Sequence, residues 1–177
     1  MKNNIVLILC LVVVFSLAGC TTKITGNETV HIASGEISNA KNIRKDVCEL
    51  YLNVLEDLWN VDSGLNNEIS QIGIDLSELS DLDKEEKDYV MSEFASKHNL
   101  PYIARTWEEL CEQGYIDKEN LIWEDGLFLS IKTNEDNSSF DAYKWRSGLG
   151  AYFFGQCTVQ KNADGTWSYT VGQEMIS

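Results

Sequence analysis

The chain has 177 residues, of which 28 are Asp or Glu and 14 are Lys or Arg, so its formal net charge is −14 at pH 7. Nucleic acids and anionic lipid headgroups repel so acidic a protein, and we exclude nucleic acid as a partner. The length suits one domain with a real hydrophobic core, and hardly two.

Residues 1–19 are predicted to be a signal peptide. Lys2 precedes an apolar stretch over residues 5–17 that only Ser16 interrupts. A membrane-spanning helix needs roughly 20 apolar residues, so this stretch has the length of a signal peptide's hydrophobic region instead. It ends in Leu17-Ala18-Gly19-Cys20, which is a branched apolar residue, two small residues and a cysteine.

This tetrapeptide resembles the lipobox of bacterial prolipoproteins. The resemblance implies that the Cys20 thiol receives a diacylglyceryl group and becomes the N-terminus after cleavage. Because the group carries more than one acyl chain, it would anchor the protein stably to the membrane, on the extracytoplasmic face. In lipobox and size the chain is similar to small surface lipoproteins of Gram-positive bacteria. The alternatives are an ordinary secretory signal with a chance cysteine, or an uncleaved short anchor.

Residues 20–40 are rich in Thr, Ser, Asn and Gly and lack apolar periodicity. We interpret them as a lipidated cysteine followed by a flexible tether, with a reach of roughly 25 Å. Residues 41–177 then form a single globular domain.

Three helices are predicted in the first half of this domain. Helical spacing of apolar residues predicts the first over residues 42–59. Asp83, with Glu86 three residues later, forms a capping box that starts the second, which ends near His98. Thr106 and Glu109 form another capping box that starts a short third helix. Gly114 ends it as a left-handed residue.

Strands are predicted around and after these helices. Alternation at Ile72, Ile74 and Leu76 favours a strand. A helix face is the alternative, which would be lined by Leu65, Ile69, Ile72, Leu76 and Leu79. Residues 121–123 and 127–131 flank Glu124-Asp125-Gly126, which predicts a hairpin or a bulged strand.

A C-terminal hairpin is predicted at Asn162-Ala163-Asp164-Gly165, where a type I turn would place Gly165 at a left-handed position. This turn sets the register, because Asn162 then pairs with Thr166. The apolar side chains share one face in that register. The resulting pairs on that face are Lys161 with Trp167, Val159 with Tyr169 and Cys157 with Val171.

The element order predicts an α+β fold in which N-terminal helices pack on a mostly antiparallel, curved sheet that ends in the C-terminal hairpin. The order is similar to that of cystatin-like and NTF2-like folds. That similarity implies a pocket between the helices and the sheet.

The aromatic segment 141–155 supplies the candidate ligand site. Tyr143, Trp145, Arg146 and Tyr152 could stack on a sugar ring or a peptide proline. In the competing interpretation the rings fill the concave face of a bent sheet.

Other chemistry finds little support. The acids between residues 75 and 86 lack the EF-hand pattern, and we expect no metal and no cofactor. Cys48, Cys111 and Cys157 are interpreted as buried thiols, with one disulfide as the alternative. A triad of Cys111, His98 and an Asp can be written, but nothing in the sequence brings its members together.

We therefore expect a membrane-anchored, non-catalytic domain that binds an envelope protein, a peptide or a glycan. The alternative is a cell-envelope hydrolase that uses paired carboxylates. A purely structural or assembly role is a third hypothesis.

Overall fold

The computed structural model describes residues 30–31, 43–135 and 137–177. The predicted signal peptide, Cys20 and most of the tether lie outside these residues. In the described part of the chain, no helix combines the length and the apolar character needed to cross a membrane. Within the predicted tether, the two-residue strand β1 (Val30–His31) pairs antiparallel with β3 (Tyr102–Ile103).

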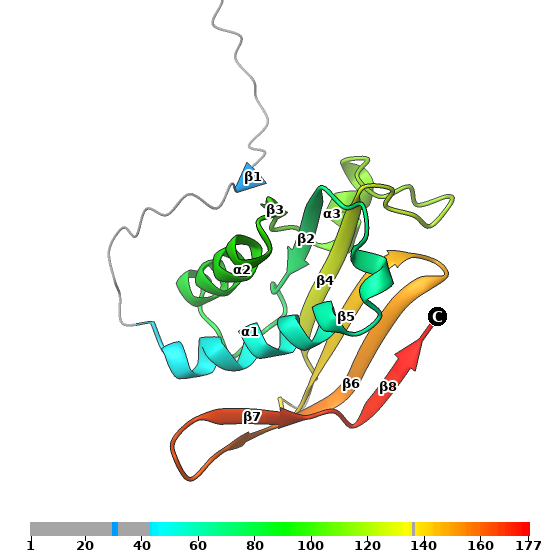
Figure 1. Ribbon diagram of the computed structural model, residues 1–177. Helices are drawn as coiled ribbons and strands as arrows, with labels where there is room; N and C mark the ends of the chain where they lie inside the picture. The colour runs from blue at the N-terminus through cyan, green and yellow to red at the C-terminus, as the bar shows by residue number, and fades with distance from the viewer. Residues whose placement is uncertain (1–29, 32–42, 136) are drawn as a thin grey trace, which may run out of the picture.

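The strands of the described residues form a mixed, mostly antiparallel sheet in the order β1-β3-β2-β4-β5-β6-β7, with β8 also paired to β6 (Figure 1). β2 runs parallel to β3 and to β4, and the remaining pairs are antiparallel. This confirms the predicted α+β class. The strands not yet bounded are β2 (Gln71–Asp75), β4 (Gly126–Thr133), β5 (Phe140–Ser147), β6 (Gly150–Lys161), β7 (Trp167–Thr170) and β8 (Gln173–Ile176).

The helices begin at the predicted signals. α2 (Lys84–His98) starts at the Asp83–Glu86 capping box, and α3 (Trp107–Glu112) starts at the box formed by Thr106 and Glu109. α1 (Lys45–Asn60) starts three residues later than predicted and is followed by a short 3-10 helix, η1 (Ser63–Asn66). Gly114, just after α3, has the expected left-handed conformation, with φ +78°.

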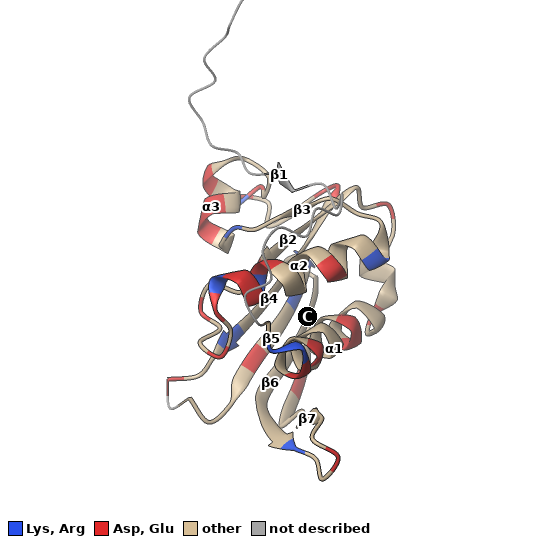
Figure 2. Ribbon diagram, turned by 90° about the vertical axis from the view of Figure 1, so that its left-hand side faces the viewer, with Lys and Arg blue, Asp and Glu red and all other residues tan. Residues whose placement is uncertain are grey.

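The helices divide between the two faces of the sheet. α1 and α2 cover one face and enclose the main core, to which β4 contributes Leu127 and Leu129. α3 lies on the other face over a smaller core, to which the intervening Phe128 belongs. Acidic residues lie on all three helices (Figure 2). Side chains of the main core therefore occupy the space between the paired helices and the sheet.

The C-terminal hairpin has the predicted turn and register. Lys161 pairs with Trp167, and Val159 pairs with Tyr169. The Gly165 amide donates to the Asn162 carbonyl (3.0 Å), and Gly165 has φ +90°. β7 ends at Thr170, one residue short of the predicted pair between Cys157 and Val171.

The hairpin folds against α1. Trp167 Nε1 donates to Asp46 Oδ2 (2.9 Å), and the Tyr169 hydroxyl donates to Asp57 Oδ2 (2.6 Å). In Figure 1 the hairpin runs beneath α1, so that helix packs between the sheet and the hairpin.

The structure corrects the prediction for residues 121–131. They do not form a hairpin or a bulged strand, because β4 begins only at Gly126 and Ile122 forms bridges with Asp117 and Ser147. Trp123 instead folds over Gly126, where an added Cβ would lie 1.9 Å from the indole ring. Residues 71–75 form a strand, so the helical alternative for that segment is wrong.

Candidate functional site

The sheet separates the four residues of the predicted aromatic site. Side chains alternate between the faces of a strand. On β5, Tyr143 and Trp145 therefore face α3, while Arg146 reaches the loop after α1. On β6, Tyr152 packs against the main core, on the face of α1 and α2. These residues consequently do not form one site.

Trp145 belongs to the smaller core. It is 4% exposed, and its ring meets that of Trp107 edge to face with centroids 4.2 Å apart. Its cross-strand neighbours are Phe128 and Ala151. For Trp145 the packing interpretation of the aromatic segment describes what the structure contains.

Arg146 and Tyr152 hold local structure together. The Arg146 guanidinium donates to the carbonyls of Leu65 (3.1 Å), Asn67 and Glu124 (2.9 Å), and so joins the loop after α1 to the loop before β4. The Tyr152 hydroxyl donates to a carboxylate on β8, Glu174 (2.6 Å).

Lys144 is a buried cation that the sequence analysis did not single out. It is 0% exposed, and its Nζ donates to the carbonyls of Trp59 (3.0 Å), Val61 (2.8 Å) and Asp62 (3.2 Å). Because a helix leaves its last carbonyls unpaired, Lys144 completes the C-terminal end of α1. Burial lowers the pKa of Lys144 to about 8. The inward alternation of Phe140, Ala142 and Lys144 was the available signal.

On the face of the sheet that α3 covers, the side chains pass from buried to partly exposed along the strands. Phe128, Trp145 and Ala151 form a transverse row that lies beneath Trp107 of α3. Two residues along β5, the next row consists of paired residues on β4, β5, β6 and β8, which we call the ring row: Ser130, Tyr143, Phe153 and Met175.

The ring row is only partly covered. The rings of Tyr143 and Phe153 meet edge to face, with centroids 6.1 Å apart and planes at 66°. Both residues are partly exposed, and Met175 is 51% exposed. The ring row therefore marks where the covering helix ends and the open part of this face begins.

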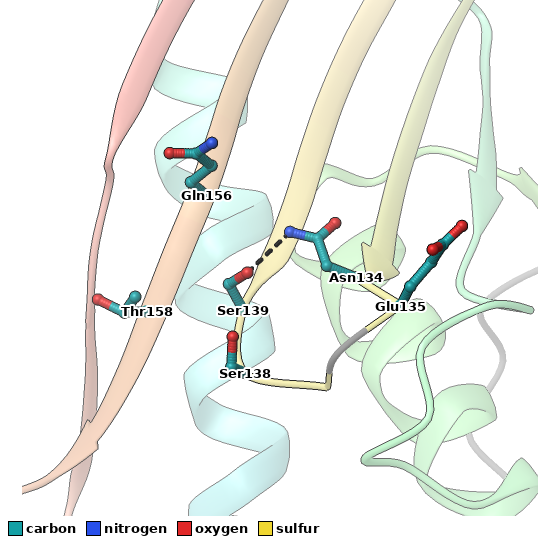
Figure 3. Close-up of a pocket in the computed structure, with 6 residues that line it drawn as sticks. All are labelled: Asn134, Glu135, Ser138, Ser139, Gln156 and Thr158. Carbon is teal, nitrogen blue, oxygen red and sulfur yellow. Dashed lines mark hydrogen bonds between the residues drawn. The ribbon is translucent and has the colours of Figure 1, made fainter.

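A polar pocket lies further along the same face, with a cavity volume of ≈ 490 Å³. The loop between β4 and β5 lines one side and β6 lines the other (Figure 3). Asn134 Nδ2 donates to Ser139 Oγ (2.8 Å), which fixes the amide on the loop side. The described residues of its lining offer hydrogen-bonding side chains and one carboxylate: Asn134, Glu135, Ser138, Ser139, Gln156 and Thr158.

Gln156 is the strained residue of this pocket. It has φ +52°, a left-handed conformation that is costly for a residue with a side chain. The pairing of β5 with β6 slips here by one residue, which makes a bulge. The backbone N–H of Gln156 donates to Asp141 Oδ1 (2.8 Å), which holds the bulge. The exposed Gln156 side chain is thereby placed at the pocket wall.

A smaller cavity of ≈ 160 Å³ lies beyond the ends of β2 and β3, beside the start of α2. Such crevices often bind ligands in α/β proteins. Two of its lysines already bond within the protein. Lys84 pairs with Asp88 (2.8 Å), and Lys87 donates to the Ser77 carbonyl (2.9 Å). This cavity is therefore the weaker candidate.

The structure corrects the triad that could be written with His98 and Cys111. His98 lies between Trp59 and Phe94 at the junction of α1 and α2, where its Nε2 is 3.1 Å from Glu56 Oε1. Cys111 packs with the smaller core on the opposite face of the sheet. The sheet separates them, so they cannot act together.

The cysteine thiols are not activated as nucleophiles. Cys48 and Cys157 are buried free thiols, and Cys111 is a partly exposed one. Burial raises the pKa of Cys48 to about 11 and that of Cys157 to about 12, which suppresses the nucleophilic thiolate. Within the described ranges, no group of three or more His, Cys, Asp or Glu is arranged to hold a metal ion.

Comparison with known proteins identifies no relative: no family model, curated protein or solved structure matches the chain.

Proposed function

We propose that this chain is a lipid-anchored lipoprotein on the extracytoplasmic face of the cell membrane, with a non-catalytic domain that binds an envelope ligand. The Leu17-Ala18-Gly19-Cys20 lipobox supports the anchor. The polar pocket supports the binding role, because hydrogen-bonding side chains line an open cavity of a size that suits small ligands, roughly 300–1,000 Å³. The ligand is an envelope protein, a peptide or a glycan.

The place of Gln156 is the observation that carries the binding role, because of the six described non-glycine residues with positive φ it is the one in the lining of the pocket. A left-handed non-glycine residue persists only where its surroundings enforce it, and such residues cluster at functional sites. Here a bulge and the Asp141 bond enforce it. The result is an amide side chain at the wall of the pocket.

The rival hydrolase has less support. Glycoside hydrolysis needs a carboxylic acid with a raised pKa that faces a second carboxylate. Among the described residues that line the polar pocket, Glu135 is the one carboxylate. Where the structure clearly shifts the pKa of a carboxyl group, as at Glu86 and Asp117, the pKa falls.

The anchor is tested by replacing its cysteine. We expect Cys20→Ala to abolish incorporation of radiolabelled palmitate and to leave the protein unprocessed or released from membranes. Fractionation and N-terminal sequencing measure this, with Cys10→Ala as the matched control within the same leader. If Cys20→Ala stays membrane-bound and is cut at the same bond, the anchor proposal fails.

The binding role is tested by hydrogen exchange on the full chain in detergent, with and without isolated cell-envelope polymer. We expect protection at residues 134–139 and 156–158. Protection confined to other segments, or none, contradicts the proposed site. Release of soluble fragments from the polymer that Glu135→Gln abolishes would replace the binding role by the hydrolase.

A further inference from the structure

The ring row and the polar pocket form one continuous surface. On the α3 face, alternate residues run from Tyr143 through Asp141 of β5 to Ser139, which directly precedes β5 and lines the pocket. Along β6, they run from Phe153 past the bulge at Gln156. Four strand residues span roughly 13 Å, so a ligand that contacts both parts must be an oligomer rather than one small molecule.

The two parts differ in chemistry. The ring row offers apolar contact through two rings at 66°, so that one ring presents a face where the other presents an edge. The pocket offers the amides of Asn134 and Gln156 and the hydroxyls of Ser139 and Thr158. These groups donate and accept hydrogen bonds without a net charge. A sugar has the matching construction, with apolar C–H faces and a rim of hydroxyl groups.

The charge of this surface favours neutral polymers over anionic polymers as ligands. Lys132 is the cation in the row between the rings and the pocket, paired across the sheet with Asp141. Its Nζ forms an ion pair with Glu78. Glu135 adds a negative charge to the pocket, and the whole chain carries −14. The surface therefore repels phosphate-rich polymers and admits uncharged ligands.

We propose that this surface binds neutral oligosaccharides, with Tyr143 and Phe153 stacking on one sugar unit and Gln156 and Asn134 hydrogen-bonding another. The proposal rests on the proposed binding role and names its ligand class. Of the four candidate residues predicted from the sequence, this surface keeps Tyr143. Residues from the open part of the face take the place of Trp145, Arg146 and Tyr152.

The test is calorimetric titration of the purified full chain in detergent with cellotriose and triacetylchitotriose. Poly(glycerol phosphate) and a proline-rich peptide are titrated in parallel. We expect a neutral trisaccharide to bind, and Gln156→Gly and Tyr143→Leu each to raise its Kd about tenfold or more. Gln156→Gly permits the left-handed backbone and removes the side chain with its amide. Gln113→Ala, an exposed amide beyond α3, is the matched control and should leave Kd unchanged.

Two results would overturn the proposal: neither trisaccharide binds, or either variant, Gln156→Gly or Tyr143→Leu, binds like the wild type. Binding of the peptide or the phosphate polymer at residues 134–139 and 156–158 would refute the glycan and keep the binding role. If a variant fails to fold, hydrogen exchange on the wild type decides. The trisaccharide must then protect residues 139–143 and 153–158.

Discussion

The two faces of the sheet differ in how completely they are covered. α1 and α2 enclose one face, and even a lysine ammonium is buried there because Lys144 meets three backbone carbonyls. On the other face, α3 has only six residues and covers the row of Phe128 and Trp145, beyond which the side chains become exposed. Stability thus depends mainly on the first face, and the second leaves room for ligand contacts.

Lys144→Met should have the largest effect, because it removes a buried cation that donates to three carbonyls at the end of α1. The Trp59 and Asp62 carbonyls keep Asn66 Nδ2 and the Leu65 amide as donors, whereas the Val61 carbonyl loses its donor. We expect the free energy of unfolding to fall by about 3 kcal/mol, measured by urea denaturation at pH 7. Lys118→Met, at an exposed lysine, is the control and should change stability little. A comparable stability of both variants would show that the first face does not depend on this cation.

Lys144 also makes the free energy of unfolding depend on pH, and the Lys144→Met variant should lose this dependence. The pKa of Lys144 is about 8 in the folded protein and 10.5 in its ordinary state. Between these values the unfolded chain binds more protons than the folded one, so this group makes stability rise with pH. Subtracting the Lys144→Met curve from the wild-type curve isolates that rise from the buried thiols and tyrosines. A flat difference curve from pH 8 to pH 10 would contradict the lowered pKa.

Gly126→Ala probes the packing of the second face. A Cβ at residue 126 would lie 1.9 Å from the Trp123 ring, so the indole must move. Overpacking of this kind costs about 1–3 kcal/mol, and near-ultraviolet circular dichroism should report the displaced indole. Gly114→Ala is not a matched control because of its positive φ, whereas Gly64→Ala is, since its Cβ would have only ordinary contacts. A loss of equal size at both sites would argue against tight packing beneath α3.

Glu86 makes the packing of α1 and α2 on the first face sensitive to acid. Its carboxylate is 2% exposed, bonds with Arg44 Nε (2.8 Å) and completes the α2 capping box. The Arg44 guanidinium lowers the pKa of Glu86 to about 2 from 4.5. Its stabilisation is therefore present above pH 4.5 and is lost as the pH falls towards 2.

We expect this acid loss to be about 1–2 kcal/mol, because solvent screens Arg44, whose side chain is 52% exposed. Glu86→Gln should flatten the stability curve between pH 4.5 and pH 2, and Glu85→Gln, at its exposed neighbour, should not. If the free energy of unfolding of Glu86→Gln still falls between pH 4.5 and pH 2 as it does in the wild type, another group causes the acid sensitivity.

The sequence predicted those features that depend on neighbours along the chain. The capping boxes at Asp83 and Thr106 and the turn at Gly165 appear as predicted, because each involves residues within a few positions of one another. The parallel pairing of β2 with β4 and the strand β8 were not predicted, because strand order depends on contacts between distant residues. The positions of the four candidate site residues could not be predicted for the same reason. A run of aromatics on two antiparallel strands alternates between faces, and only the covering helices decide which ring is exposed.

Gln156→Gly should have the smallest effect on stability, and of opposite sign. Glycine accepts φ +52° without the cost that a side chain incurs, so relief of strain should stabilise the protein by about 0.5–1 kcal/mol. The same change deletes the amide that the pocket presents, so oligosaccharide binding should weaken while the melting temperature rises. Gln160→Gly, at an exposed strand residue outside the pocket lining, should lower stability instead, because glycine weakens a strand. If Gln156→Gly destabilises the protein as Gln160→Gly does, the left-handed residue carries no strain, and the open face is not built for binding at Gln156.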